Sequence, residues 1–241
     1  ELMQRADMAM YAAKRSKSGY AFYDPEADSY SLDRLALKGE LRHAITHDEL
    51  VLYYQPKIDF GSGRISGVEA LVRWQHPKHG LMLPDDFIPL AEATGLIKPL
   101  TVWVLRQALR QCGEWHRCGL LVTMAVNISA TSLLDLQLPE IVAQELKETE
   151  TEPAWLELEI TETAVMKEPA LAIDVINKLN NMGVRLAIDD FGTGYSSMAY
   201  LQKLLVAKIK IDKSFVMHMN SNENNAIIVR SLIGLGHNLG L

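Results

Sequence analysis

The chain has 241 residues, of which 48% are hydrophobic and 22% charged, and its formal net charge is −6. This balance is typical of a folded globular protein and excludes a disordered chain. The acidic excess disfavours a surface that binds DNA or RNA polymers, because such a surface needs a surplus of lysine and arginine.

Two cysteines, Cys112 and Cys118, are too few for a disulfide framework and indicate reduced thiols. No apolar run approaches the ~18 residues that a membrane span requires. We therefore expect a cytoplasmic domain. Attachment of a longer parent protein to a membrane, through segments outside this chain, stays open.

Helical spacing of apolar residues predicts a helix over residues 2–15, with Gly19 as its stop. Residues 20–30 are rich in turn formers and predict a short strand and a linker. A second helix is expected over 31–46. We place the tail of a preceding domain at 1–25, a linker and lead-in helix at 26–47, and the main domain at 48–241.

Strands are predicted over 50–58 and 65–74, separated by a glycine-rich turn that leaves no room for a helix. These two strands should therefore form an antiparallel hairpin. A helix-rich stretch follows over 84–117, and strands then alternate with helices, which indicates a parallel α/β sheet. The later strands are expected at 121–128, 155–160, 184–189 and 206–211, and the helices at 131–149, 168–182, 196–203 and 224–239.

Several of these strands carry polar residues opposite their apolar face, mostly near the carboxyl end. Both faces of an open parallel sheet are covered by helices and should be apolar. A barrel explains the pattern, because apolar residues would pack on the outer helices while polar residues point into the mouth. The polar residues are Glu69, Arg73, Asn127, Glu157, Glu159, Asp189, Lys208, Lys210 and Asp212.

Four of these residues and the neighbouring Asp190 offer only oxygen donors to a metal ion. The four are Glu69, Asn127, Glu159 and Asp189. Such donors suit Mg²⁺ or Mn²⁺, and so many carboxylates at close range need a cation to neutralise them. Two ions about 4 Å apart are a common device for phosphodiester hydrolysis. The alternative is that each carboxylate is a solvated strand-end charge.

The sequence contains a run of motifs that resembles the EAL-type cyclic-di-GMP phosphodiesterase family. The first is Glu69-Ala70-Leu71, and the run extends in family order from about residue 32 to the end of the chain. Residues 1–24 resemble, more weakly, the end of a GGDEF-type diguanylate cyclase domain. The other motifs are Tyr54-Gln55-Pro56, Asn127-Ile128-Ser129, Glu159-Ile160-Thr161-Glu162, Asp189-Asp190-Phe191-Gly192-Thr193-Gly194 and Lys210-Ile211-Asp212.

The resemblance implies a modified (β/α)₈ TIM-type barrel with an antiparallel first strand, and hydrolysis of cyclic-di-GMP to linear pGpG. It implies one metal ion on Glu69, Asn127, Glu159 and Asp189, and a second on Asp189 and Asp190. Lys210 would act with Glu69 in catalysis by orienting the attacking water or a phosphate oxygen, and Glu162 would brace the loop after Asp190. Substrate contacts would come from Gln55, Leu71 and Arg73.

Two features leave alternatives open. The family continues past the helix that ends near Leu241 with a strand carrying Glu-Gly-Val-Glu and a closing strand, so we expect a fragment with impaired hydrolysis on its own. The family also includes members that only bind cyclic-di-GMP or a partner. The expected partners are cyclic-di-GMP, a neighbouring GGDEF-like domain and a second copy of the chain, bound through the loop after Asp190.

Overall fold

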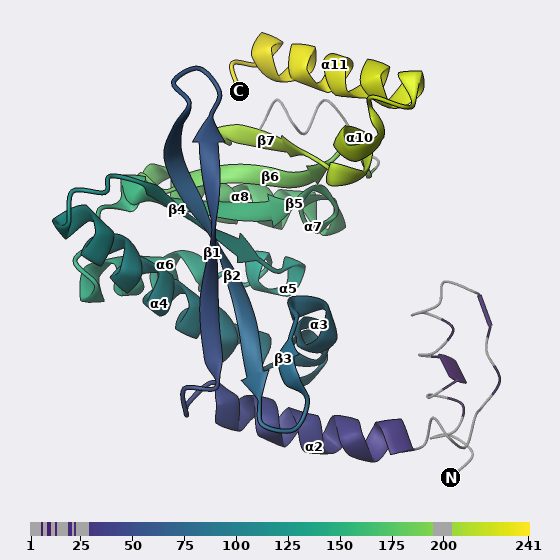
Figure 1. Cartoon of the computed structure of the whole chain (residues 1–241). Helices are drawn as coiled ribbons and strands as arrows, with labels where there is room; N and C mark the ends of the chain where they lie inside the picture. The colour runs from purple at the N-terminus through teal and green to yellow at the C-terminus, as the bar shows by residue number, and fades with distance from the viewer. Residues whose placement is uncertain are drawn as a thin grey trace.

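The computed structural model describes residues 29–194 and 204–241, with residues 6, 9, 10, 13, 19, 20 and 22 as isolated positions. The helix predicted over 196–203 lies outside the described residues, as does most of the segment before residue 29. Within the described ranges, seven strands form one sheet in the order β1-β2-β4-β5-β6-β7, with β3 beside β2 (Figure 1).

The continuously described part of the chain begins with a helix and a long antiparallel hairpin, both of which the sequence predicted. The elements are α2 (Ser29–Ala44), β1 (Leu50–Asp59) and β2 (Arg64–His76). The turn between the strands closes on Asp59, whose Oδ1 accepts a hydrogen bond from the Ser62 amide at 2.7 Å. Gly63 completes the turn at φ 68°, a conformation that glycine adopts without strain.

A short strand that sequence patterns did not indicate precedes two helices. The elements are β3 (Gly80–Met82), α3 (Pro84–Thr94), α4 (Ile97–Arg117) and β4 (Thr123–Ile128). The predicted helical stretch over 84–117 is divided at Gly95, which ends α3 in the left-handed conformation at φ 75°. The buried residues of α4 include Leu105, Ala108, Leu109 and Cys112, spaced so that they form one face of the helix.

The helix predicted over 131–149 is also divided, because Asp135 accepts a hydrogen bond from the Gln137 amide in a turn and Pro139 starts a new helix. A short helix directly after β5 was not predicted. The elements are α5 (Ala130–Leu133), α6 (Leu138–Glu148), η2 (Pro153–Trp155), β5 (Leu156–Thr161), α7 (Glu162–Lys167) and α8 (Pro169–Asn181).

The last described elements are two further strands and two helices. They are β6 (Arg185–Phe191), β7 (Lys208–Ile211), α10 (Lys213–His218) and α11 (Glu223–Asn238). The α10 helix was not predicted. Its N-cap is Asp212, whose Oδ1 accepts a hydrogen bond from the Ser214 amide at 2.8 Å. Figure 1 shows α11 lying beyond β7 and α2 crossing the opposite end of the hairpin.

Strands β2, β4, β5, β6 and β7 run parallel, and β1 runs antiparallel to β2. On β5, Leu156, Leu158 and Ile160 join the hydrophobic core, while Glu157 and Glu159 are buried on the other face. The core thus lies between the sheet and its covering helices, as predicted for a barrel. Among the described residues, no helix has both the length and the apolar composition needed to cross a membrane.

The sheet is strongly curved, as side-chain contacts across its inner face show. Lys57 on β1 contacts Glu157 and Glu159 on β5, although β2 and β4 lie between these strands in the sheet. Such contacts require the sheet to bend around its inner face, as in a barrel wall. Within the described residues the path of paired strands starts at β1 and ends at β7, so the wall is open between them.

Candidate active site

Alternate residue pairs of the hairpin point to the inner face of the sheet. Their register sets how far along the strands each side chain lies. The register pairs Lys57 with Gly67, Gln55 with Glu69, and Tyr53 with Leu71. Residues paired across an antiparallel ladder point to the same face. Lys57 is therefore the deepest of these side chains, and Leu71 lies nearer the carboxyl end of β2.

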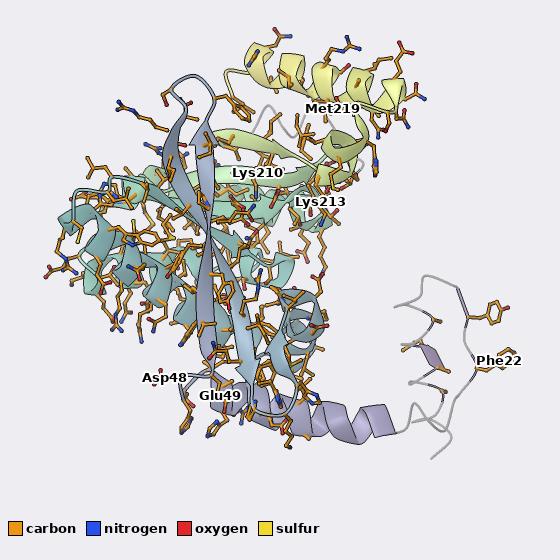
Figure 2. The ribbon with its side chains drawn as sticks, viewed as in Figure 1. Phe22, Asp48, Glu49, Lys210, Lys213 and Met219 are labelled. Atoms are coloured by element: carbon orange, nitrogen blue, oxygen red, sulfur yellow. The ribbon has the colours of Figure 1, made fainter. Side chains whose placement is uncertain are left out.

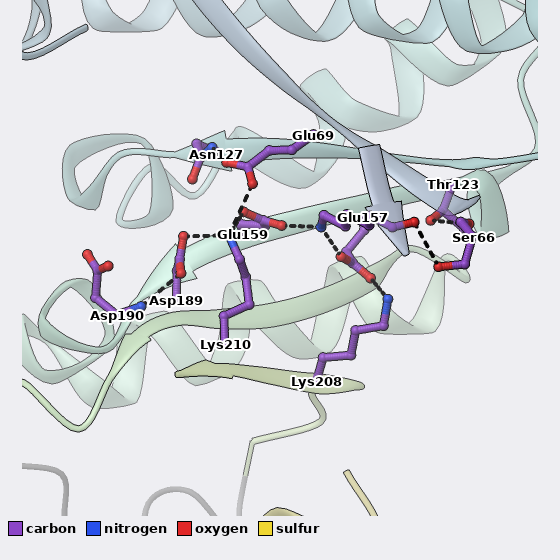
Figure 3. A network of polar contacts seen from close by, with 11 residues as sticks. Ser66, Glu69, Thr123, Asn127, Glu157, Glu159, Asp189, Asp190, Lys208 and Lys210 are labelled. Atoms are coloured by element: carbon purple, nitrogen blue, oxygen red, sulfur yellow. Dashed lines mark hydrogen bonds and ion pairs between the residues drawn. The ribbon is translucent and has the colours of Figure 1, made fainter. Parts of the chain in front are cut away.

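Lys210 lies at the centre of the site (Figures 2 and 3). Its Nζ atom lies 2.8 Å from Asp189 Oδ2 and 3.4 Å from Glu69 Oε2, and it also pairs with Glu159 Oε2. The three carboxylates come from β6, β2 and β5, whereas Lys210 comes from β7. Burial would lower the pKa of Lys210, but Glu159 and its neighbours outweigh burial and hold that pKa above its ordinary value.

Glu159 is the most enclosed of the three carboxylates, with a side chain that is 0% exposed. Burial raises the pKa of Glu159, and the opposing pull of Lys57 and Lys210 does not fully cancel this effect. Its two oxygens have different partners, since Oε1 pairs with Lys57 and Oε2 with Lys210. Glu159 is thus held between a deep lysine and the central lysine.

Below this centre lies a second group of charges that sequence reasoning did not assign to the site. Lys57 Nζ lies 2.8 Å from Glu157 Oε1, and Lys208 Nζ lies 2.7 Å from Glu157 Oε2. Burial raises the pKa of Glu157, but Lys208 and Lys57 outweigh it and leave that pKa below its ordinary value. The sequence could have indicated Lys57, because it lies two positions after the predicted substrate contact Gln55 and therefore on the same face of the strand.

Asp189 and Asp190 lie where β6 departs from regular pairing. The β6–β7 register shifts between Ile188 and Phe191, and Asp190 has φ 53°. A left-handed conformation at a non-glycine residue is unfavourable, and such strain is common at functional sites. Asp190 donates its amide to Asp189 Oδ1 at 2.9 Å, and burial, followed by the Asp189 and Asp212 charges, raises the pKa of its carboxyl.

Glu162 contacts the loop after β6. It is buried at the start of α7, and its Oε2 accepts a hydrogen bond from the Gly192 amide at 2.8 Å. A Cβ atom on Gly194 would lie 2.8 Å from Glu162 Oε1, so the loop approaches this carboxylate closely. A side chain at position 194 would therefore require the Glu162 carboxylate to shift.

The three predicted substrate contacts share the inner face of the hairpin with Glu69, but the structure does not bring them to Lys210. Gln55 is exposed, and Leu71 is half-buried. Arg73 donates from its guanidinium to the Val72 carbonyl at 2.8 Å and lies 5.7 Å from the centre of the Tyr53 ring. Leu71 and Arg73 thus lie beyond Glu69 toward the carboxyl end of β2, whereas Gln55 lies opposite Glu69.

The donor atoms around Lys210 fit a hard divalent cation in chemistry, because they are carboxylate and amide oxygens. Asn127 belongs to the group, since its Nδ2 donates to Glu69 Oε1 at 2.8 Å. In the arrangement seen here the Lys210 ammonium occupies the point where the carboxylates converge. Accordingly, no group of three or more His, Cys, Asp or Glu residues in the described ranges is positioned to hold a metal ion.

Asp212 shares the strand parity of Lys210 but has different partners. Its carboxylate caps α10, where it accepts hydrogen bonds from Ser214, and it lies near the Asp190 carboxyl. The hydrogen bonds from Ser214 hold the pKa of Asp212 below its ordinary value. The difference arises because β7 ends at Ile211, and the chain turns into a helix at the next residue.

Comparison with known proteins gives the same family as the motifs. A family model described as EAL domain matches residues 38–241. Over the whole chain, 41% of residues are identical to those of the bifunctional diguanylate cyclase/cyclic di-GMP phosphodiesterase MucR of Pseudomonas aeruginosa. The corresponding identity is 37% with the cyclic di-GMP phosphodiesterase PdeR of Escherichia coli. The chain spans 36% of the length of each of these relatives.

Solved structures show the same likeness. The c-di-GMP complex of the PaMucR phosphodiesterase aligns with a TM-score of 0.82 and 42% identity, covering 86% of this chain and 84% of that one. The EAL enzyme Bd1971, in its form bound to cAMP and cyclic-di-GMP, aligns with a TM-score of 0.80 and 31% identity. That alignment covers 88% of this chain and 58% of Bd1971.

Proposed function

Because the chain belongs to the EAL domain family, we propose that it hydrolyses cyclic-di-GMP to linear pGpG. The observation that carries this proposal is the convergence of Glu69, Glu159 and Asp189 on Lys210 from four strands of a curved, parallel sheet. Relatives named as cyclic di-GMP phosphodiesterases, and a solved relative in complex with c-di-GMP, support the same substrate.

Membership of the family implies dependence on a divalent metal ion. We propose Mg²⁺ or Mn²⁺, with two ions. Glu69, Asn127, Glu159 and Asp189 would hold one ion, and Asp189 with Asp190 the other. When bound, such ions supply a water nucleophile of lowered pKa and neutralise charge on the reacting phosphate. The closeness of the Asp189, Asp190 and Asp212 carboxylates supports a cation there, because neighbouring carboxylates repel one another without one.

The chain's own residues would position the dinucleotide and its charge. Lys210 carries three N–H donors next to the carboxylates, so its ammonium can orient water or stabilise negative charge on a phosphate oxygen. Gln55, Leu71 and Arg73 would contact the substrate from the inner face of the hairpin. Glu162 would keep the loop after Asp190 in place through Gly192.

The direct test measures conversion of cyclic-di-GMP to pGpG by chromatography, with Mn²⁺ and with excess EDTA. For a longer protein that carries this chain we expect turnover with Mn²⁺, none with EDTA, and inhibition by Ca²⁺, which prefers looser coordination. Residues 1–241 alone should show little or no turnover. Glu69→Ala should abolish turnover while the melting temperature stays near that of the wild type. Turnover in EDTA would refute metal dependence, whereas tight binding of cyclic-di-GMP without hydrolysis in Mn²⁺ would show the alternative, a receptor.

The domain arrangement also belongs to this proposal. We propose that residues 1–25 are the tail of a GGDEF-like domain, that 26–47 form a linker and lead-in helix, and that 48–241 carry the phosphodiesterase site. The name of MucR, which combines diguanylate cyclase and phosphodiesterase, supports this order. We further propose a homodimer formed through the loop after Asp190, which sedimentation with and without cyclic-di-GMP would test.

A further inference from the structure

We propose that Lys57 is a positioning residue for Glu159. Its ammonium fixes one carboxylate oxygen of Glu159, so that the other oxygen faces the site formed by Glu69, Asp189 and Lys210. The inference rests on the proposed function, since that function gives Glu159 its part in holding a divalent cation. Neither the family motifs nor the sequence patterns assign a role to Lys57.

The contacts of Lys57 show how it acts. Its Nζ atom lies 2.8 Å from Glu157 Oε1 and pairs with Glu159 Oε1. The Lys57 side chain is 24% exposed, whereas both glutamate side chains are 0% exposed. Because Lys57 lies on β1 and both glutamates on β5, it reaches them across the inner face of the sheet. The ion pair with Lys57 restricts rotation of the Glu159 carboxylate, because Lys57 is held on a different strand.

The charges alternate along a single line of ion pairs, drawn in part in Figure 3. Lys208 pairs with Glu157, Glu157 with Lys57, Lys57 with Glu159, and Glu159 with Lys210. Lys57 is the middle member and contacts both glutamates, whereas Lys208 contacts Glu157 and not Glu159. Lys208 is therefore a matched control, with the same charge in the same cluster but two ion pairs farther from Glu159.

Positioning and simple electrostatics predict opposite effects on cation binding. If Lys57 acted only through its charge, Lys57→Met and Lys208→Met would both remove a positive charge near the carboxylates and so tighten binding of a cation. If Lys57 acts by orienting Glu159, then Lys57→Met frees the carboxylate and weakens binding. Loss of a residue that orients a metal ligand commonly costs 10- to 100-fold in metal affinity.

The experiment measures Mn²⁺ binding by calorimetry on the metal-free protein, together with the melting temperature. We expect Lys57→Met to weaken Mn²⁺ binding about 10- to 100-fold, and Lys208→Met to leave the affinity unchanged or raise it. Equal affinity of Lys57→Met and the wild type, or a tighter complex, would overturn the inference. An equal loss of affinity in both variants would overturn it as well, because it would reflect disruption of the whole cluster.

Two further measurements separate positioning from a merely structural role. Lys57→Met should lower kcat more than it raises the KM for cyclic-di-GMP at saturating Mn²⁺, and a change in melting temperature alone would contradict the inference. If circular dichroism shows that Lys57→Met is unfolded, Lys57→Gln is compared with Lys208→Gln in the same way. Failure of the wild type to bind Mn²⁺ would instead refute the proposed function, and the inference with it.

Discussion

Lys210 shows how one residue can serve both stability and chemistry. Its ammonium faces three carboxylates, each from a different strand. One of these carboxylates, that of Glu159, has no exposed side-chain surface. A charge buried this deeply is unfavourable unless it is paired. The same ammonium lies beside the carboxylates that the proposed reaction needs. Its structural and catalytic contributions must therefore be measured separately.

We predict that Lys210→Met lowers the free energy of unfolding by about 1 to 3 kcal/mol, because Glu159 loses one partner but keeps Lys57. Turnover of the folded fraction should fall about 100-fold or more, as expected when a group that stabilises developing charge is removed. Urea unfolding and pGpG formation, normalised to folded protein, measure the two effects. Turnover that survives in the folded fraction would remove Lys210 from the catalytic residues.

At the scale of elements, the short helix α7 supports the loop that follows β6. The α7 helix begins at Glu162, next to Thr161, whose hydroxyl accepts a hydrogen bond from the Ala164 amide at 3.2 Å. This N-cap fixes the start of α7 and thus the direction of the Glu162 carboxylate. Because Glu162 holds the Gly192 amide, the end of β5 determines where the loop after β6 lies.

We predict that Glu162→Ala lowers turnover about 10- to 100-fold, because the loop next to Asp190 loses its anchor and small displacements of reacting groups are costly. Glu162→Gln is the matched control, since its amide carbonyl can still accept the hydrogen bond from Gly192. Hydrogen exchange of residues 192–194 should rise in Glu162→Ala and stay near the wild type in Glu162→Gln. Equal turnover in the two variants would show that the contact does not matter for activity.

The α2 helix is held against the end of the hairpin by polar contacts of Glu40. Glu40 on α2 pairs with Lys78 at 2.9 Å and with His76 at 3.2 Å, and the His76 side chain is 0% exposed. The hydrogen bond from Lys78 holds the pKa of Glu40 below its ordinary value of 4.5, against a smaller opposing effect of burial. Docking of α2 should therefore depend on the ionised form of Glu40.

We predict that Glu40→Gln increases hydrogen exchange of α2 at pH 7 and that this difference from the wild type disappears in acid. A lowered pKa in the folded state means that the stabilisation is present above pH 4.5, and is lost as the pH falls through the folded-state value. Exchange rates corrected for intrinsic pH dependence, with α4 as internal reference, provide the measurement. A difference that persists at pH 3 would show that the charge of Glu40 is not the cause.

For the whole molecule, the inner face of the sheet is unusual for a protein core because it holds many charges. In the described residues, Lys57, Lys208 and Lys210 are paired there with carboxylates from β2, β5 and β6. The opposite face of the same sheet packs against helices through an apolar core. Stability thus comes mainly from the outer layer, while the inner layer holds carboxylates in a crowded arrangement that a cation can stabilise.

We predict that Mn²⁺ at 100 times its dissociation constant stabilises the protein by about 2.7 kcal/mol, which raises the melting temperature by roughly 5 to 10 °C. Asp189→Asn should abolish most of this shift, because it removes a charge shared by the two proposed sites. Lys98→Met, which removes an ion pair with Asp135, is the control and should keep the shift. A shift of the same size in Asp189→Asn would place the ion elsewhere.

Much of the architecture could be predicted from the sequence because it depends on local patterns. The short glycine turn between two apolar runs required an antiparallel hairpin, and alternation along Leu156–Ile160 identified which glutamates face inward. The breaks at Gly95 and at residues 134–137 were missed, because helical spacing continues through them. The motif run added a hypothesis about which residues form the site.

Strand alternation by itself determined which face each charged residue occupies, and the order of the motifs determined the family. Only the tertiary structure decided which charges meet, because the stagger of neighbouring strands and the curvature of the sheet set the depth of each side chain. Lys57 reaches β5 across two intervening strands, and Asp212 turns away to cap a helix, although both share a parity with site residues. The face on which a side chain lies depends on its own strand alone, whereas its ion-pair partners across the inner face depend on the positions of all the strands.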